Sequence, residues 1–117
     1  MAVETYNGWK NYPTWAVNLW LTNDQGTSEM LAEIASEEYA DAPNCLQVRD
    51  GIWTVDEARR YNTADHIREF VEEMLAQADE PQYGMSADLL GYALGQVEWQ
   101  EIADAALQAW IEGLEYA

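Results

Sequence analysis

The chain has 117 residues, which is enough for one domain and too few for two that each bury a core. Apolar residues make up 49% of it, including six Trp, so wholesale disorder is excluded. The 22 Asp and Glu residues against five Lys and Arg give a net charge of −17, which repels phosphate backbones and anionic lipids and argues against direct binding of nucleic acid or membrane.

The first predicted helix covers residues 12–23. Pro13 suits its first turn, where a missing N–H costs nothing. Its apolar residues recur at helical spacing and predict a central helix that is buried on most sides. That apolar stripe consists of Tyr12, Trp15, Ala16, Leu19 and Trp20. A single polar line opposes it and consists of Thr14, Asn18 and Thr22.

A second helix and a short ribbon are predicted next. Thr27 or Ser28 is expected to cap a helix that ends near residue 42, just before Pro43. Between residues 46–48 and 52–53, the Asp50-Gly51 pair is a turn signal that permits a short β-hairpin near residues 46–53.

Three further helices are predicted in the second half of the chain. Thr54 and Glu57 form a capping box that starts a short helix to about residue 61, and Asn62-Thr63 is expected to recap a longer one. The inward face of that helix is Ile67, Phe70, Val71, Met74, Leu75 and Ala78. Ser86 is expected to cap a helix that buries Leu89, Leu90, Ala93, Leu94 and Val97. A last helix from about residue 98 is expected to bury Trp99, Ile102, Ala103, Ala106, Trp110 and Leu114.

The predicted fold is therefore mainly α, a compact bundle of about five helices that forms a single helical domain over residues 1–117. No secretory signal is visible near the N-terminus, and no apolar run approaches the roughly 18 residues of a membrane span. The expected location is the cytoplasm of the host cell.

Catalytic and metal sites are not expected. His66 is the only histidine and Cys45 the only cysteine, and neither stands in a recognisable catalytic or ligand motif. Two carboxylate pairs at i, i+4, Asp65 with Glu69 and Glu69 with Glu73, are typical of a solvated acidic helix face. We therefore expect no cofactor and no enzymatic activity.

The acidic residues are unevenly distributed. From Glu69 to Ala117 the chain carries eleven acidic residues and no Lys or Arg. One predicted outward face carries Asp65, Glu69, Glu72 and Glu73, and another carries Glu101, Asp104, Glu112 and Glu115. Carboxylates one turn apart are separated by roughly 6 Å along a helix, which is comparable to phosphate spacing, so two such faces side by side could imitate DNA.

Salt adaptation and a generic adaptor role would account for the acidity as well as mimicry does. An acidic surface keeps proteins soluble in high salt, and the single lysine fits this interpretation, whereas the excess of Glu over Asp, 14 to 8, disfavours it. The protein could also be a generic acidic adaptor for a basic partner.

Two blocks of the chain resemble a known family. Residues 6–24, from Tyr6-Asn7-Gly8-Trp9 to Leu21-Thr22-Asn23-Asp24, are similar to an N-G-W-x-N-Y-x-T-W-x-V-x-L-W-L-x-N-D-like signature. Residues 87–90 and 97–103 are similar to the second block of the same family. These are small acidic proteins of phages and other mobile elements whose function is not established, so no site residue is carried over. The resemblance implies a mobile-element context, in which small acidic inhibitors of host defence are common.

The sequence thus favours a non-enzymatic binding protein, an anti-defence inhibitor of the anti-CRISPR or anti-restriction type that mimics DNA charge. The expected partner is a basic nucleic-acid-binding host protein or defence complex. The alternative is an acidic accessory or adaptor protein whose charge reflects solubility or salt adaptation. The predicted contact residues are Glu69, Glu72, Glu73, Asp79, Glu80, Glu101, Asp104, Glu112 and Glu115, with Tyr6, Trp9 and Trp53 as hydrophobic anchors.

Overall fold

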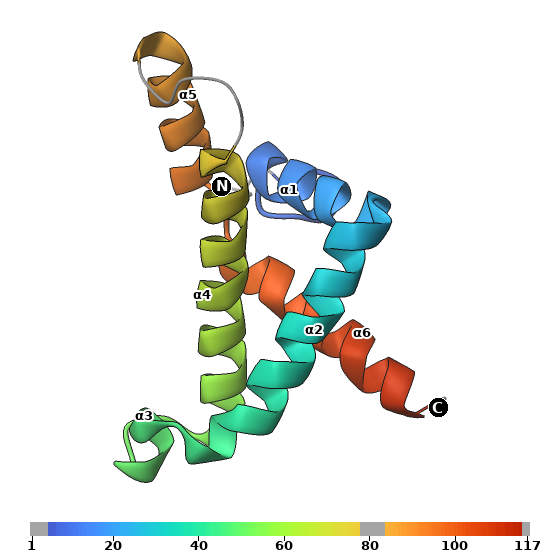
Figure 1. The fold of residues 1–117 in the computed structure, drawn as a ribbon, viewed down its shortest axis with the longest axis vertical. Coiled ribbons are helices and arrows are strands. Elements are labelled where there is room, and N and C mark those ends of the chain that lie inside the picture. Colours follow the sequence, from blue (N-terminus) through green and yellow to red (C-terminus); the bar gives the residue numbers. More distant parts are fainter. Residues whose placement is uncertain (1–4, 78–83, 116–117) are drawn as a thin grey trace.

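The computed structural model describes residues 5–77 and 84–115, with the backbone alone described at Ser86 and Glu115 (Figure 1). Within these residues the chain forms six α-helices and one 3₁₀ helix, which confirms the mainly α fold. The α-helices are α1 (Tyr12–Asn23), α2 (Gln25–Asp41), α3 (Leu46–Arg49), α4 (Val55–Ala76), α5 (Gly84–Gly95) and α6 (Trp99–Glu115). The 3₁₀ helix, η1 (Ala42–Asn44), follows directly on α2.

Three helices form the centre of the molecule. In Figure 1, α2 and α4 lie at the front and α6 crosses behind both, and all three pack against one another. α1 lies against the start of α2, and α5 stands beyond the C-terminal end of α4. The core is apolar, and its fully buried large side chains come from these helices: Leu21, Ile34, Ile67 and Ile102. Each such side chain contributes roughly 1.5–3 kcal/mol through burial.

The predicted hairpin near residues 46–53 is wrong, because residues 46–49 form α3. Gly51 has φ +74 and follows the helix directly. The N–H of Gly51 donates to the Val48 carbonyl at 3.1 Å, and that of Ile52 donates to the Gln47 carbonyl at 2.8 Å. These two bonds are the Schellman pattern that ends a helix. The Asp50-Gly51 pair is therefore a helix stop and not a hairpin turn.

Two predicted helix starts also differ from the structure. The cap of α2 is Asp24, whose Oδ2 accepts from the N–H of Thr27 at 3.0 Å, and not Thr27 or Ser28. The predicted break at Asn62-Thr63 is absent, since α4 is continuous and Thr63 is fully buried in its middle. The capping box of Thr54 and Glu57 at the start of α4 is confirmed.

The first helix is not buried on most sides as predicted. Trp20 is 76% exposed and Tyr12 56%, whereas Thr14, assigned to the polar line, is fully buried. Other predicted inward residues are also exposed: Met74, Leu89 and Leu114. Along α1, residues 14, 17 and 21 face the core, because Thr14 makes hydrogen bonds that draw this side inward.

Those hydrogen bonds join the two ends of the chain. The hydroxyl of Thr14 accepts from the N–H of Glu98 at 2.9 Å and donates to Oδ1 of Asn11 at 2.6 Å. Nδ2 of Asn11 donates to the carbonyl of Gln96 at 2.7 Å. The N–H of Lys10 donates to Oε1 of Glu101 at 2.8 Å. Residues 10–14 thus hold the start of α6, and two segments 84 or more residues apart form one structural unit.

Candidate functional site

The predicted acidic residues of α4 form one exposed stripe. Glu69, Glu72 and Glu73 are all exposed and share this stripe with Asp65. Arg68 reaches Asp65 at 3.7 Å and Glu72 at 3.9 Å, so its charge offsets part of the stripe. Glu69 and Glu73 have no basic partner within 4 Å in the described chain.

Two predicted contact residues of α6 are occupied within the protein itself. Oε1 of Glu101 accepts the backbone N–H of Lys10. Asp104 accepts two hydrogen bonds from Arg60, at 3.1 and 3.3 Å, and a third from Gln100 at 2.9 Å. These carboxylates therefore hold helices together, and the structure does not present them as free charges beside the α4 stripe.

The remaining predicted acids lie elsewhere. Glu112 is exposed on α6, where its Oε1 accepts from Gln108 at 3.1 Å. Asp79 and Glu80 lie outside the described residues, and so does the side chain of Glu115.

The predicted hydrophobic anchors pack within the molecule. Tyr6 and Trp9 pair through two backbone hydrogen bonds of 2.8 Å, and Trp9 is half-buried against the core. The Tyr6 ring lies 4.9 Å from that of Trp15 and is 39% exposed. Trp53 is half-buried with its ring edge-to-face on Tyr61 at 5.1 Å. All three make aromatic or core contacts that stabilise the fold.

The most regular acidic feature of the structure lies on α2 and was not predicted. Exposed carboxylates recur there at every fourth residue, and none is within 4 Å of a basic group in the described chain. We call this set the α2 ladder: Glu29, Glu33, Glu37 and Asp41. The opposite side of α2 is buried through Leu31, Ile34 and Ala35. The i, i+4 repeat is visible in the sequence, but the base-free C-terminal half carries the stronger charge signal.

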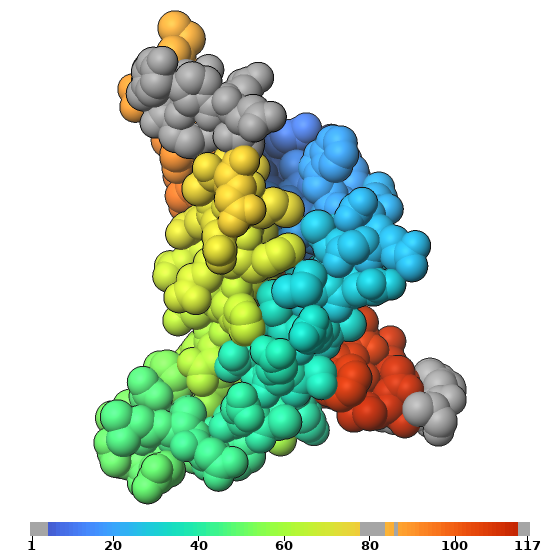
Figure 2. Space-filling view, in the orientation of Figure 1, coloured from blue at the N-terminus to red at the C-terminus, as the bar shows by residue number. Residues whose placement is uncertain are grey.

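The α2 ladder and the α4 stripe belong to the same side of the molecule. α6 packs behind both helices and covers their buried sides, so their exposed carboxylates point away from it (Figures 1 and 2). A shallow hollow of about 380 Å³ lies between the two helices and is lined by Glu38, Asn62, Asp65, His66 and Glu69. In it, Nδ1 of His66 lies 3.1 Å from Oε1 of Glu38, so the only histidine is half-buried and bridges α4 to α2.

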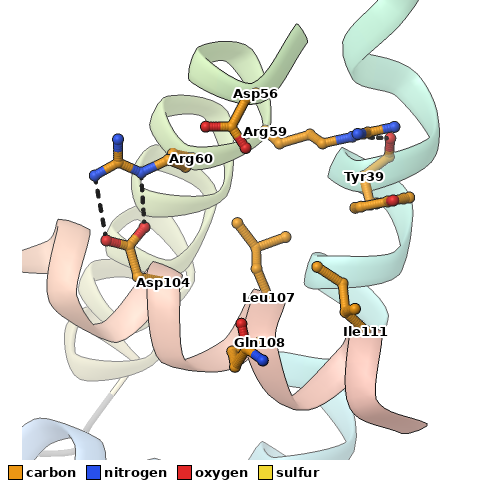
Figure 3. Close-up of a pocket in the computed structure, with 8 residues that line it drawn as sticks. All are labelled: Tyr39, Asp56, Arg59, Arg60, Asp104, Leu107, Gln108 and Ile111. Atoms are coloured by element: carbon orange, nitrogen blue, oxygen red, sulfur yellow. Dashed lines mark hydrogen bonds and ion pairs between the residues drawn. The ribbon is translucent and has the colours of Figure 1, made fainter. Parts of the chain in front are cut away.

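A second hollow, of about 340 Å³, lies where α2, α4 and α6 meet and contains two of the five basic residues (Figure 3). The Arg59 guanidinium lies 3.6 Å above the centre of the Tyr39 ring, and its Nε donates to the Tyr39 carbonyl at 3.1 Å. Arg60 binds Asp104, and the hydrogen bond and charge of this carboxylate raise the pKa of Arg60 above its ordinary value. Both arginines are thus engaged in holding α4 to its neighbours.

The chemistry of these hollows is that of charge pairing. No serine or cysteine lines either of them. In residues 5–77 and 84–115, no three acidic, histidine or cysteine side chains are grouped to hold a metal ion. No helix in that part of the chain is long and apolar enough to cross a membrane.

Fold and surface together define a small all-α protein with a strongly acidic face. Residues 2–112 match the family of unknown function DUF7249, and the chain belongs to this family. Neither a curated protein nor a solved structure matches the chain. The family match includes both sequence blocks, and the structure joins these blocks through Asn11, Thr14 and Glu98.

Proposed function

We propose that this protein is a non-enzymatic inhibitor encoded by a mobile element, and that its acidic face occupies the nucleic-acid groove of a basic host protein or defence complex. The contact face consists of the α2 ladder and the α4 stripe. The observation that carries the proposal is the ladder itself, in which four exposed carboxylates at regular spacing lack a basic partner in the described chain.

The spacing of the ladder supports imitation of a phosphate strand. Four residues of α-helix rise about 6 Å and turn about 40° beyond a full circle, so the ladder spans about 18 Å and winds as it rises. One DNA strand carries one charge per about 3.4 Å of axis. The α2 ladder alone has a lower charge density, and the neighbouring α4 stripe brings the density of the shared face closer to that of DNA.

The ladder also works against the stability of its own helix. Like charges at i, i+4 destabilise a helix by about 0.2–0.5 kcal/mol per pair. Basic residues elsewhere in the protein are used to neutralise Glu98, Asp104 and the Asp65–Glu72 region, whereas the ladder is left uncompensated. Complementary charge on a partner would offset this repulsion and speed association.

The test compares two variants of equal net charge. E33Q/E37Q/D41N removes three ladder charges and changes the net charge from −17 to −14. D50N/D88N/E112Q gives the same net charge by removing exposed acids elsewhere on the surface. Each protein is immobilised and used to capture proteins from a lysate of the source cells at 0.05 M NaCl, followed by elution with duplex DNA.

We expect the unsubstituted chain and the D50N/D88N/E112Q variant to retain a DNA-binding protein that duplex DNA releases, and the ladder variant to lose it. Equal loss in both variants, or capture that DNA does not reverse, would contradict mimicry. Salt adaptation is tested by urea unfolding from 0.02 to 2 M NaCl. A chain that unfolds without denaturant at low salt would support adaptation instead.

A further inference from the structure

An open apolar groove runs between α1, the second half of α4 and α5. Its volume is about 480 Å³, within the range of about 300–1,000 Å³ typical of sites that bury a ligand. Its walls include Ala16, Val17, Trp20, Met74, Leu90 and Leu94. Figure 1 shows α1 and α5 at the C-terminal end of α4, away from the α3 end of the molecule.

The groove leaves large apolar side chains in contact with water. Trp20 is 76% exposed and Met74 39%, although both line a concave surface that could enclose them. α5 adds Leu89 and Tyr92, which are 63% and 71% exposed. Single exposed apolar residues are ordinary, but a group of them around a groove is typical of an interaction site.

The charges around the groove all have one sign. α1 contains no charged residue, and Asp24 caps its end. The charged residues of α4 beyond Arg68 and of α5 are acidic without exception: Glu69, Glu72, Glu73 and Asp88. Arg68 lies within 4 Å of Asp65 and Glu72, and it lines a separate hollow. An occupant of this groove therefore meets an apolar floor and a negative surround.

This charge distribution decides between occupants. A second copy of the chain brings another −17 and is repelled, and so is an anionic lipid surface. A helix with one apolar face and Lys or Arg on its other faces is complementary in both respects. Met74 and Trp20 suit such a contact, because methionine adapts to the shape of its partner and tryptophan gives a large contact area.

We propose that this groove binds one basic amphipathic helix of a protein partner, with its apolar face against Trp20 and Met74. The inference does not depend on the docking of the α2 ladder, because it is carried by other residues.

The test uses a fluorescein-labelled 14-residue helix of Leu and Lys with leucines at i, i+3, i+4 and i+7, titrated by fluorescence anisotropy in 0.15 M NaCl. A peptide of the same composition in scrambled order carries the same charge without an apolar face. We expect the amphipathic peptide to bind at least tenfold more tightly than the scrambled one. Equal affinities would overturn the proposal, since charge alone would then explain binding.

Matched variants locate the binding site. Met74→Glu should weaken the amphipathic peptide at least tenfold, because docking would bury an unpaired carboxylate. Ile52→Glu adds the same charge at an exposed apolar residue outside the groove and should change affinity less than twofold. Trp20→Ala is the second groove variant, and circular dichroism checks the fold of each protein. Undiminished binding by both groove variants would overturn the proposal.

Two further measurements separate this inference from its rivals. The ladder variant E33Q/E37Q/D41N should keep the preference for the amphipathic peptide over the scrambled one, even if it fails to capture a host protein. Light scattering at 0.1 mM should give the mass of a monomer. A dimer that Met74→Glu dissociates would show that a second copy occupies the groove, and would refute the proposed partner.

Discussion

The substitution Thr14→Val tests whether residues 10–14 hold the start of α6. Thr14 is fully buried, and its hydroxyl both accepts from the N–H of Glu98 and donates to Asn11. Valine has nearly the same shape and also branches at Cβ, so packing and helix propensity change little. The substitution therefore removes the hydroxyl alone.

The expected loss follows from the partners that remain. Oδ1 of Asn11 still accepts from the Thr14 backbone N–H at 3.0 Å, so only the Glu98 N–H is left without an acceptor. An unsatisfied buried donor costs about 1–3 kcal/mol, and the lost bond to Asn11 adds about 1 kcal/mol. After the gain from a more apolar buried side chain, we expect a net loss of about 2–3 kcal/mol. Because the entropy of unfolding is about 2.1 cal/mol/K per residue, this lowers the Tm by roughly 8–12 °C.

Urea unfolding followed by circular dichroism at 222 nm measures this loss, and two variants serve as controls. Thr14→Ser keeps both hydrogen bonds and should cost only about 1 kcal/mol for the missing methyl group. Thr22→Val removes an exposed hydroxyl that bonds the Asn18 carbonyl of its own helix, so it should change stability by less than about 0.5 kcal/mol. If Thr14→Val and Thr22→Val unfold at the same urea concentration, the proposed link does not stabilise the fold.

Four further predictions concern stability, measured in the same way. Ile67→Ala empties a fully buried position and should cost about 3–4 kcal/mol, whereas Ile52→Ala, at a residue 67% exposed, should cost less than about 1 kcal/mol. Thr54→Ala removes the capping box of α4 and should cost about 1 kcal/mol; no loss would mean that the cap is redundant. Arg60→Gln should cost less than about 1 kcal/mol, because the side chains of the Arg60–Asp104 pair are 41% and 44% exposed, and a larger loss would show that the pair is better shielded than its exposure indicates. E33Q/E37Q removes all three neighbouring repulsions of the α2 ladder and should stabilise by about 0.5–1.5 kcal/mol, a gain that shrinks at 0.5 M NaCl; destabilisation would contradict the repulsion argument.

Local signals predicted the helical elements where a single segment settles the outcome. The capping box at Thr54 defines the start of α4, because both of its hydrogen bonds join residues three apart. The prediction at Asp50-Gly51 was wrong because glycine at positive φ serves both hairpin turns and helix ends. The carbonyls that accept from residues 51 and 52 decide between them, and they lie on α3.

The candidate site was harder to predict than the helices. Composition established that the protein is acidic, and the repeat of residues 29, 33, 37 and 41 was present in the sequence. Which carboxylates remain free depends on distant partners, since Asp104 meets Arg60 44 residues away and Glu101 meets Lys10 91 residues away. Periodicity within one helix contains no information about such pairs.

The sequence by itself determined the helical class, the capping box of α4 and the sign and size of the charge, because these depend on local spacing and composition. Only the tertiary structure decided which side of each helix is buried. α1 turns Thr14 inward and Trp20 outward, against its apolar pattern, because the Thr14 hydroxyl satisfies the backbone at the start of α6. The same packing leaves the α2 ladder free and the groove beside Trp20 open, since both depend on which helices meet in space.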